Sequence, residues 1–154
     1  MLSEQAKSEI RALQARYPVT RSALGPALYV AQREVGWLPA SVLAEVAELF
    51  GLEVTEVGEF ASFYHMFSLQ PLGKHVIRYC ESAPCHVVGG RQVFERLIEE
   101  LNLQPQETSP DGKWTFITVS CLGLCGVAPV LVIDEDMYGN VRPDQIPDIL
   151  SRYN

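Results

Sequence analysis

The chain has 154 residues, of which 47% are hydrophobic and 20% charged, a composition typical of a soluble globular protein and not of a disordered one. Its formal net charge of −7, with only twelve Lys and Arg residues, argues against a nucleic acid as partner, because phosphate binding needs clustered basic side chains. The N-terminus lacks the apolar segment of a signal peptide, and no uninterrupted apolar stretch of about 18 residues exists. We therefore expect a cytoplasmic protein without direct membrane insertion.

The first seventy residues carry apolar side chains at helical spacing. Three helices are predicted from the positions Ala6, Ile10, Leu13 and Tyr17, then Leu24, Leu28, Ala31 and Val35, then Val42, Leu43, Val46 and Leu49. A fourth helix is predicted from Val54 to about Tyr64, before a segment with the Pro and Gly content of a linker. The sequence thus predicts an N-terminal helical bundle over residues 1–70 and a second domain over residues 71–154.

Short β-like runs alternate with helical patterns in the second domain. Strands are predicted at residues 75–79, 114–119 and 129–134, a short return strand at 138–141, and helices at 87–101 and 143–153. Residues 104–113 are predicted to form turns, because they are rich in Pro, Gly and Asp. The order is β-α-β-β-β-α, so the fold class is α+β or α/β.

The four cysteines of the chain form two close pairs, Cys80 with Cys85 in CESAPC and Cys121 with Cys125 in CLGLC, and thirty-five residues separate the pairs. Each pair follows the carboxyl end of a predicted strand. If these two strands are parallel neighbours, both loops emerge at the same edge of the sheet and the four sulfurs can converge. The sequence therefore predicts one site with four thiolate ligands.

The spacing of the cysteines favours a [2Fe–2S] cluster over a single zinc ion. Structural zinc sites usually present Cys-x2-Cys turns, and neither pair has that spacing, whereas a cluster with two thiolates on each iron accepts longer loops. Small residues in these loops would let backbone N–H groups approach the sulfurs; they are Ser82, Ala83, Gly89, Gly90, Gly123, Gly126 and Ala128. The non-redox alternative is a zinc-stabilised structural or assembly subunit that uses the same cysteines.

Other uses of the same residues are weaker. Disulfides within each pair would need an oxidising compartment, and a thioredoxin-type dithiol needs Cys-x-x-Cys. His86 could replace a thiolate in a Rieske-like site, but four cysteines already suffice, so we expect it to be a loop or helix-start residue. Gly89 and Gly90 are expected to allow close approach to the cysteine loop and not to bind phosphate.

The run of aromatic residues from Phe60 to Phe67, FASFYHMF, has two interpretations. It can pack between the bundle and the second domain, which we favour, or it can anchor a partner protein, since aromatic and Met side chains are enriched in interface cores.

The segments CESAPCHVVGG and TSPDGKWTFITVSCLGLCGVAPVLVIDEDMYGNVRPDQIPDIL closely resemble the small [2Fe–2S] subunit of the NADH dehydrogenase module of respiratory complex I (the NuoE family). That family also includes subunits of NAD-dependent hydrogenases and formate dehydrogenases. Upstream, ALGPALYVAQREVGWLP and VGEFASFYHMF are similar to the family's helical bundle, so the resemblance covers nearly the whole chain. The pattern with CLGLCG is its most specific part.

The resemblance implies a thioredoxin-like [2Fe–2S] ferredoxin domain with Cys80, Cys85, Cys121 and Cys125 as ligands of one cluster per chain. It also implies a partner flavoprotein subunit that binds FMN and NADH within a larger oxidoreductase complex, with this cluster exchanging one electron with the flavin. The parent complex would be an NADH:quinone oxidoreductase, at the cytoplasmic face of a membrane, or alternatively an NAD-dependent hydrogenase, of the electron-bifurcating kind or not, or a formate dehydrogenase. No Gly-rich nucleotide motif or catalytic triad is found, so no independent substrate-converting site is expected.

Overall fold

The computed structural model describes residues 1–153, and contacts within the chain divide it into two compact units, Met1–Pro71 and the part that begins at Leu72. Each unit has its own buried apolar core. No helix in residues 1–153 is long and apolar enough to cross a membrane.

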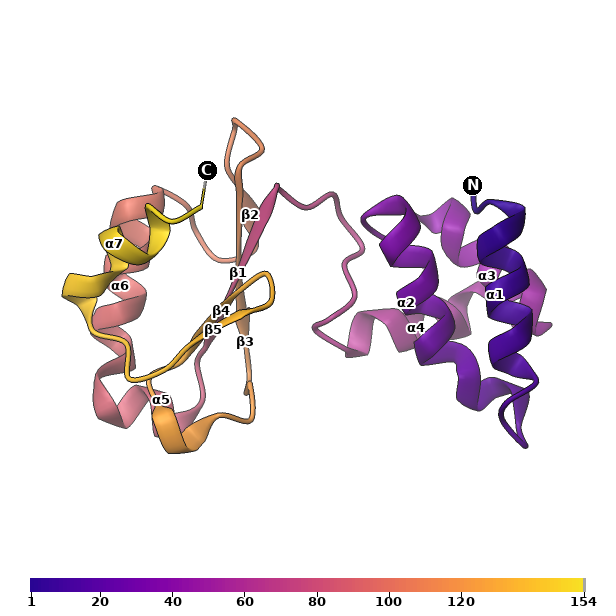
Figure 1. The fold of residues 1–154 in the computed structure, drawn as a ribbon, viewed down its shortest axis with the longest axis horizontal. Coiled ribbons are helices and arrows are strands. Elements are labelled where there is room, and N and C mark those ends of the chain that lie inside the picture. Colours follow the sequence, from indigo (N-terminus) through magenta and orange to yellow (C-terminus); the bar gives the residue numbers. More distant parts are fainter. Residues whose placement is uncertain (154) are drawn as a thin grey trace. The chain divides into compact units, whose positions relative to one another are not determined.

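The first unit is a bundle of four helices (Figure 1). They are α1 (Glu4–Gln14), α2 (Leu24–Val35), α3 (Ala40–Phe50) and α4 (Val54–Phe63), with a short 3₁₀ turn η1 (Thr20–Ala23) before α2. All four predicted helices are confirmed, but Tyr17 lies outside α1. The physical reason is Pro18, because the residue before a proline is disfavoured in helical backbone.

Local signals at the helix ends explain where these helices begin and stop. The hydroxyl of Ser3 accepts the backbone N–H of Ala6 at 3.2 Å and so caps α1. Gly36 and Gly51, with φ of +89° and +64°, end α2 and α3 in the left-handed conformation that glycine adopts most easily. The apolar stripes of the helices then meet in one core, in which Ile10, Leu28 and Val46 are fully buried.

The second unit contains a five-stranded mixed sheet with the strand order β2-β3-β1-β4-β5. The strands are β1 (His75–Cys80), β2 (Glu107–Thr108), β3 (Trp114–Val119), β4 (Leu131–Ile133) and β5 (Asp136–Tyr138). The helical segments are α5 (Ala83–Cys85), the π-helical turn η2 (His86–Gly90), α6 (Arg91–Leu101), the 3₁₀ turns η3 (Cys125–Val127) and η4 (Pro143–Gln145), and α7 (Ile146–Leu150). Strands β1 and β3 are parallel, and the other neighbours are antiparallel.

Helices α6 and α7 cover one face of this sheet (Figure 1). Alternate residues of the strands supply that face, because side chains along a strand point to opposite sides. Ile77, Phe116 and Leu131 pack there in one core with Leu97 of α6 and Ile146 of α7. The core therefore fixes the register of the strands that precede the cysteine loops.

Several details of the second unit differ from the sequence-based prediction. The helix predicted over 87–101 is regular only from Arg91, because Val88 and Gly89 have non-helical backbone angles. Strand β2 lies in a segment predicted as turns; it has only two residues and owes its existence to pairing with β3. The return strand is Asp136–Tyr138 and not 138–141, because Asp134, with φ of +54°, allows a tight turn directly after β4. Helix α7 stops at Leu150, three residues before Tyr153, whose hydroxyl instead donates to Asp136 at 2.8 Å.

Candidate metal centre

Parallel pairing of β1 and β3 brings the two cysteine loops to one edge of the sheet. The register places Cys80, the last residue of β1, opposite Val119, the last residue of β3. The backbone N–H of Glu81 still bonds to the carbonyl of Val119 at 3.0 Å before the loops diverge. In Figure 1, α5 and the orange turn that contains η3 lie at this same end of the unit. The predicted parallel arrangement is confirmed.

Cys80 and Cys85, here called the inner pair, are buried. Their exposed fractions are 2% and 1%, and Val130 is buried with them in a small apolar cluster. Leu122, Leu124 and Ala128 of the second loop pack against this cluster. The second loop thus covers the first and shields its thiols from water.

Cys121 and Cys125, here called the outer pair, are exposed to solvent. The backbone N–H of Gly123 donates to the sulfur of Cys121 at 3.3 Å, the kind of contact expected from small residues in this loop. Cys125 opens the turn η3, which a hydrogen bond from Val127 N–H to the carbonyl of Leu124 closes at 3.0 Å. None of the four cysteines is in a disulfide.

Hydrogen bonds from both loops act on the thiol of Cys80. Burial by itself would raise its pKa, but hydrogen bonds from the side chain and backbone of Ser82 and from the backbone of Leu122 outweigh burial, so the pKa lies below its usual value. The sulfur of Cys80 and the hydroxyl of Ser82 are 3.1 Å apart. Because Leu122 belongs to the other loop, this contact joins the two loops at one sulfur.

Neighbouring thiols also shift the pKa values of Cys85 and Cys125. Burial and the neighbouring Cys80 raise the pKa of Cys85, although hydrogen bonds from Ser82 and from the backbone of Val130 oppose this. The pKa of Cys125 is raised by its hydrogen bond with Cys121 and by the charge of Cys121, and the charge of Cys80 adds to this. Within each pair one cysteine thus raises the pKa of the other, and Cys80 of the inner pair acts electrostatically on Cys125 of the outer pair.

The grouping of side chains around the cysteines also bears on whether a single metal ion could bind. Within residues 1–153, no three His, Cys, Asp or Glu side chains are grouped so that they could hold a single metal ion. His86 is exposed at the start of η2, as a helix-start residue would be. That all four cysteines are ligands of one metal group stays a prediction.

Tyr79 and Gly90 form a contact that the sequence did not indicate. The hydroxyl of Tyr79 donates to the carbonyl oxygen of Gly90 at 2.7 Å in a buried environment. Burial, followed by the charges of Cys85 and Cys80, raises the pKa of Tyr79 to about 12, so this hydroxyl stays protonated at neutral pH. A side chain on Gly90 would place its Cβ 2.5 Å from the carbonyl oxygen of Cys85. The close approach expected at the Gly89-Gly90 step is thus confirmed at Gly90.

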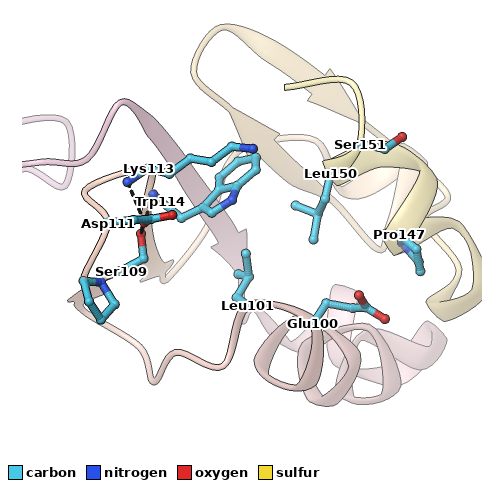
Figure 2. Close-up of a pocket in the computed structure, with 10 residues that line it drawn as sticks. Glu100, Leu101, Ser109, Asp111, Lys113, Trp114, Pro147, Leu150 and Ser151 are labelled. Atoms are coloured by element: carbon cyan, nitrogen blue, oxygen red, sulfur yellow. Dashed lines mark hydrogen bonds between the residues drawn. The ribbon is translucent and has the colours of Figure 1, made fainter. Parts of the chain in front are cut away.

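A pocket of about 570 Å³ lies away from the thiols, where the start of β3 meets the ends of α6 and α7 (Figure 2). Its β2–β3 side is a turn whose hydrogen bonds include Lys113 N–H to Asp111 at 2.9 Å and Trp114 N–H to the Ser109 hydroxyl at 2.8 Å. None of the four cysteines lines it. Ser109 and Asp111 serve the turn, Glu100 pairs with Arg96, and the Ser151 hydroxyl donates to the Asp148 carbonyl, so the pocket adds nothing to the candidate site.

The sequence profile of a known family matches almost the entire chain. The family is described as thioredoxin-like [2Fe–2S] ferredoxin, and the match covers residues 10–154. This chain belongs to that family. The predicted fold class, a helical N-terminal region followed by a thioredoxin-like ferredoxin, is confirmed.

Two relatives of this chain are named as NADH-quinone oxidoreductase subunits, and a solved hydrogenase shares its fold. An NADH-quinone oxidoreductase subunit of Rhizobium meliloti (strain 1021) is 40% identical over 147 residues, which cover 96% of this chain and 88% of that protein. The corresponding NADH-quinone oxidoreductase subunit of Escherichia coli (strain K12) is 37% identical over 137 residues, or 89% of this chain and 82% of that protein. An NAD⁺-reducing [NiFe]-hydrogenase in the H2-reduced state shares the fold over 82% of this chain and 22% of that chain, with a TM-score of 0.69 and 24% identity.

Proposed function

We propose that this chain is the electron-carrying subunit of an NADH:quinone oxidoreductase, with one [2Fe–2S] cluster held by Cys80, Cys85, Cys121 and Cys125. The observation that carries the proposal is the parallel β1–β3 pairing, which brings both cysteine loops to one edge of the sheet. The names of relatives 36–40% identical over at least 89% of this chain support the choice of complex.

The donor set fits such a cluster. Two thiolates are needed on each iron, and the inner and outer pairs each supply two cysteines from one loop. When bound, the cluster supplies a one-electron carrier. The chain itself would offset the negative charge of the site with backbone hydrogen bonds from Leu122, Gly123 and Val130, while the apolar cover over the inner pair excludes water.

The electron would come from a partner. We propose that a flavoprotein subunit with FMN and NADH docks near the exposed outer pair and exchanges one electron at a time with the cluster, within a larger cytoplasmic oxidoreductase complex. No substrate-converting step is assigned to this chain. We assign residues 1–70 as the helical bundle domain and 71–154 as the ferredoxin domain, an assignment that the two compact units support.

The test is electron paramagnetic resonance on anaerobically purified protein before and after dithionite, with iron, acid-labile sulfide and zinc quantified in the same sample. We expect a signal on reduction only, with about two irons and two sulfides per chain. Stoichiometric zinc without sulfide, persisting after anaerobic reconstitution, would instead establish the zinc-stabilised subunit.

The parent complex is tested separately by co-purification from native extract. We expect NADH:quinone reductase activity to accompany the chain. Hydrogenase or formate dehydrogenase activity in its place would leave the cluster proposal standing and overturn the choice of complex.

A further inference from the structure

We propose that Tyr79 is a positioning residue for the inner cysteine pair. Its hydroxyl ties the segment after Cys85 to the strand that ends at Cys80, and so sets the distance between these two thiols. The inference rests on the proposed function, because it assumes that both cysteines hold the cluster.

The Tyr79–Gly90 hydrogen bond closes a loop of the chain that contains the inner pair. The Tyr79 hydroxyl bonds to the Gly90 carbonyl at 2.7 Å, eleven residues further along the chain, and both Cys80 and Cys85 lie between them. Tyr79 is only 3% exposed, and its ring packs against Phe94 of α6 with the ring centroids 5.4 Å apart. The Tyr79 end of this hydrogen bond is thus fixed by its place in β1 and by packing against α6.

Gly90 transmits this position to Cys85. An added Cβ at Gly90 would lie 2.5 Å from the carbonyl oxygen of Cys85 and 2.7 Å from the Tyr79 hydroxyl oxygen. Gly90 has ordinary helical angles, φ −57° and ψ −33°, so glycine is needed for close approach and not for an unusual backbone conformation. The Cys85 carbonyl therefore packs directly against Gly90, whose own carbonyl accepts the hydrogen bond from Tyr79.

The segment between the cysteine and the tie is not a regular helix. Val88 and Gly89 have non-helical angles inside η2, and Gly89 has a φ of +99°. A turn interrupted in this way is held less firmly by its own hydrogen bonds than a continuous helix is. A buried hydrogen bond from outside the turn then decides where Cys85 sits.

The test compares Tyr79→Phe with Tyr153→Phe in the reconstituted full chain. Tyr153 is the matched control: it is 9% exposed, its hydroxyl donates to Asp136 at 2.8 Å, and it packs at the far end of β1 against His75 and Trp114. Iron release to a chelator, the paramagnetic resonance line shape and the midpoint potential are measured for both variants. We expect Tyr79→Phe to release iron about tenfold faster and to change both line shape and potential, while Tyr153→Phe matches the wild type in all three.

A second variant, Gly90→Ala, acts on the same contact from the other side. We expect faster iron release again. In the double variant we expect less than the product of the two single effects, because removal of the hydroxyl relieves one of the three contacts under 3.0 Å that the new methyl group would make.

Three results would overturn the inference. If Tyr79→Phe and Tyr153→Phe release iron alike with unchanged potentials, Tyr79 has only a general structural role. Additive effects in the double variant would show that Tyr79 does not act through Gly90. A wild-type chain without iron and sulfide would remove the proposed function first and the positioning role with it, and the metal analysis distinguishes that failure from the other two.

Discussion

The two cysteine loops lie at the same edge of the sheet but differ in their exposure to solvent. The inner pair is buried, and it is held between the end of β1 and the start of α6. The outer pair is exposed on a loop whose regular structure is the single turn η3. The sheet therefore fixes one half of the site rigidly, and leaves the other half open to solvent and to a partner.

The difference indicates a division of roles. The inner loop would determine whether a cluster can be assembled at all. If one of its buried thiols were missing, water could not enter to replace it as a ligand. The outer loop would determine how easily the cluster is reached by reductant, oxidant or chelator.

The largest expected effect comes from replacing each cysteine by alanine. In Cys80→Ala and Cys85→Ala we expect no iron or sulfide above background, because a buried vacancy cannot be filled by water. In Cys121→Ala and Cys125→Ala we expect a reduced but measurable fraction, since water can occupy an exposed coordination position. Iron and sulfide analysis with paramagnetic resonance checks this, and a fully retained signal would rule that cysteine out as a ligand.

A glycine next to the outer loop gives a test of how that loop is supported. A Cβ at Gly139 would lie 2.8 Å from Cβ of Val127, so Gly139→Ala should push η3 outward and lower the free energy of unfolding by about 1–3 kcal/mol. Gly126→Ala, in the same loop but with open space at its Cβ, should change it by less than about 0.5 kcal/mol. Thermal and denaturant unfolding measure both, and equal values would show that the outer loop has no defined support.

Alkylation of the metal-free protein should report the burial difference directly. We expect Cys121 and Cys125 to react about tenfold or more faster than Cys80 and Cys85, as judged by mass spectrometry of timed samples. Because the pKa values of Cys125 and Cys85 are raised, their thiolate fractions at neutral pH are low, and their rates should keep rising above pH 9. Uniform rates at all four thiols would contradict the buried arrangement of the inner pair.

The smallest effect is expected at Ser82. Its hydroxyl lies 3.1 Å from the sulfur of Cys80, and a donor to a cluster sulfur stabilises the more negative, reduced state. Ser82→Ala should therefore lower the midpoint potential by a few tens of mV. Ser82→Thr keeps the hydroxyl and should retain the wild-type potential. Redox titration followed by paramagnetic resonance checks this, and an unchanged potential in Ser82→Ala would remove Ser82 from the site.

The sequence predicted the elements whose signals are local. Helical periodicity placed all four helices of the first unit, and the β-branched and aromatic run 114–119 placed β3 correctly. The convergence of the cysteine loops was also predictable, because a strand–helix–strand crossover makes its two strands parallel and aligns their carboxyl ends.

Features that depend on tertiary contacts could not be predicted in this way. Strand β2 exists because β3 pairs with it, and its two residues have no periodicity of their own. The inner and outer environments of the cysteines arise from the packing of Leu122 and Leu124 over the first loop, which spacing alone does not specify. The Tyr79–Gly90 bond joins a strand to an irregular turn, so no sequence pattern indicates it.

The separation of the two loops along the chain has a consequence for biosynthesis. Cys125 follows Cys80 by forty-five residues, and a ribosome at typical rates needs about 2–9 s to translate them. During that interval the first two thiols have emerged but the segment that will bury them has not. A nascent chain in this state is open to oxidants, and supply of iron and sulfide is useful only after β3 has paired with β1. Slowing translation between these codons should therefore increase oxidative damage at the residues that the finished protein protects best.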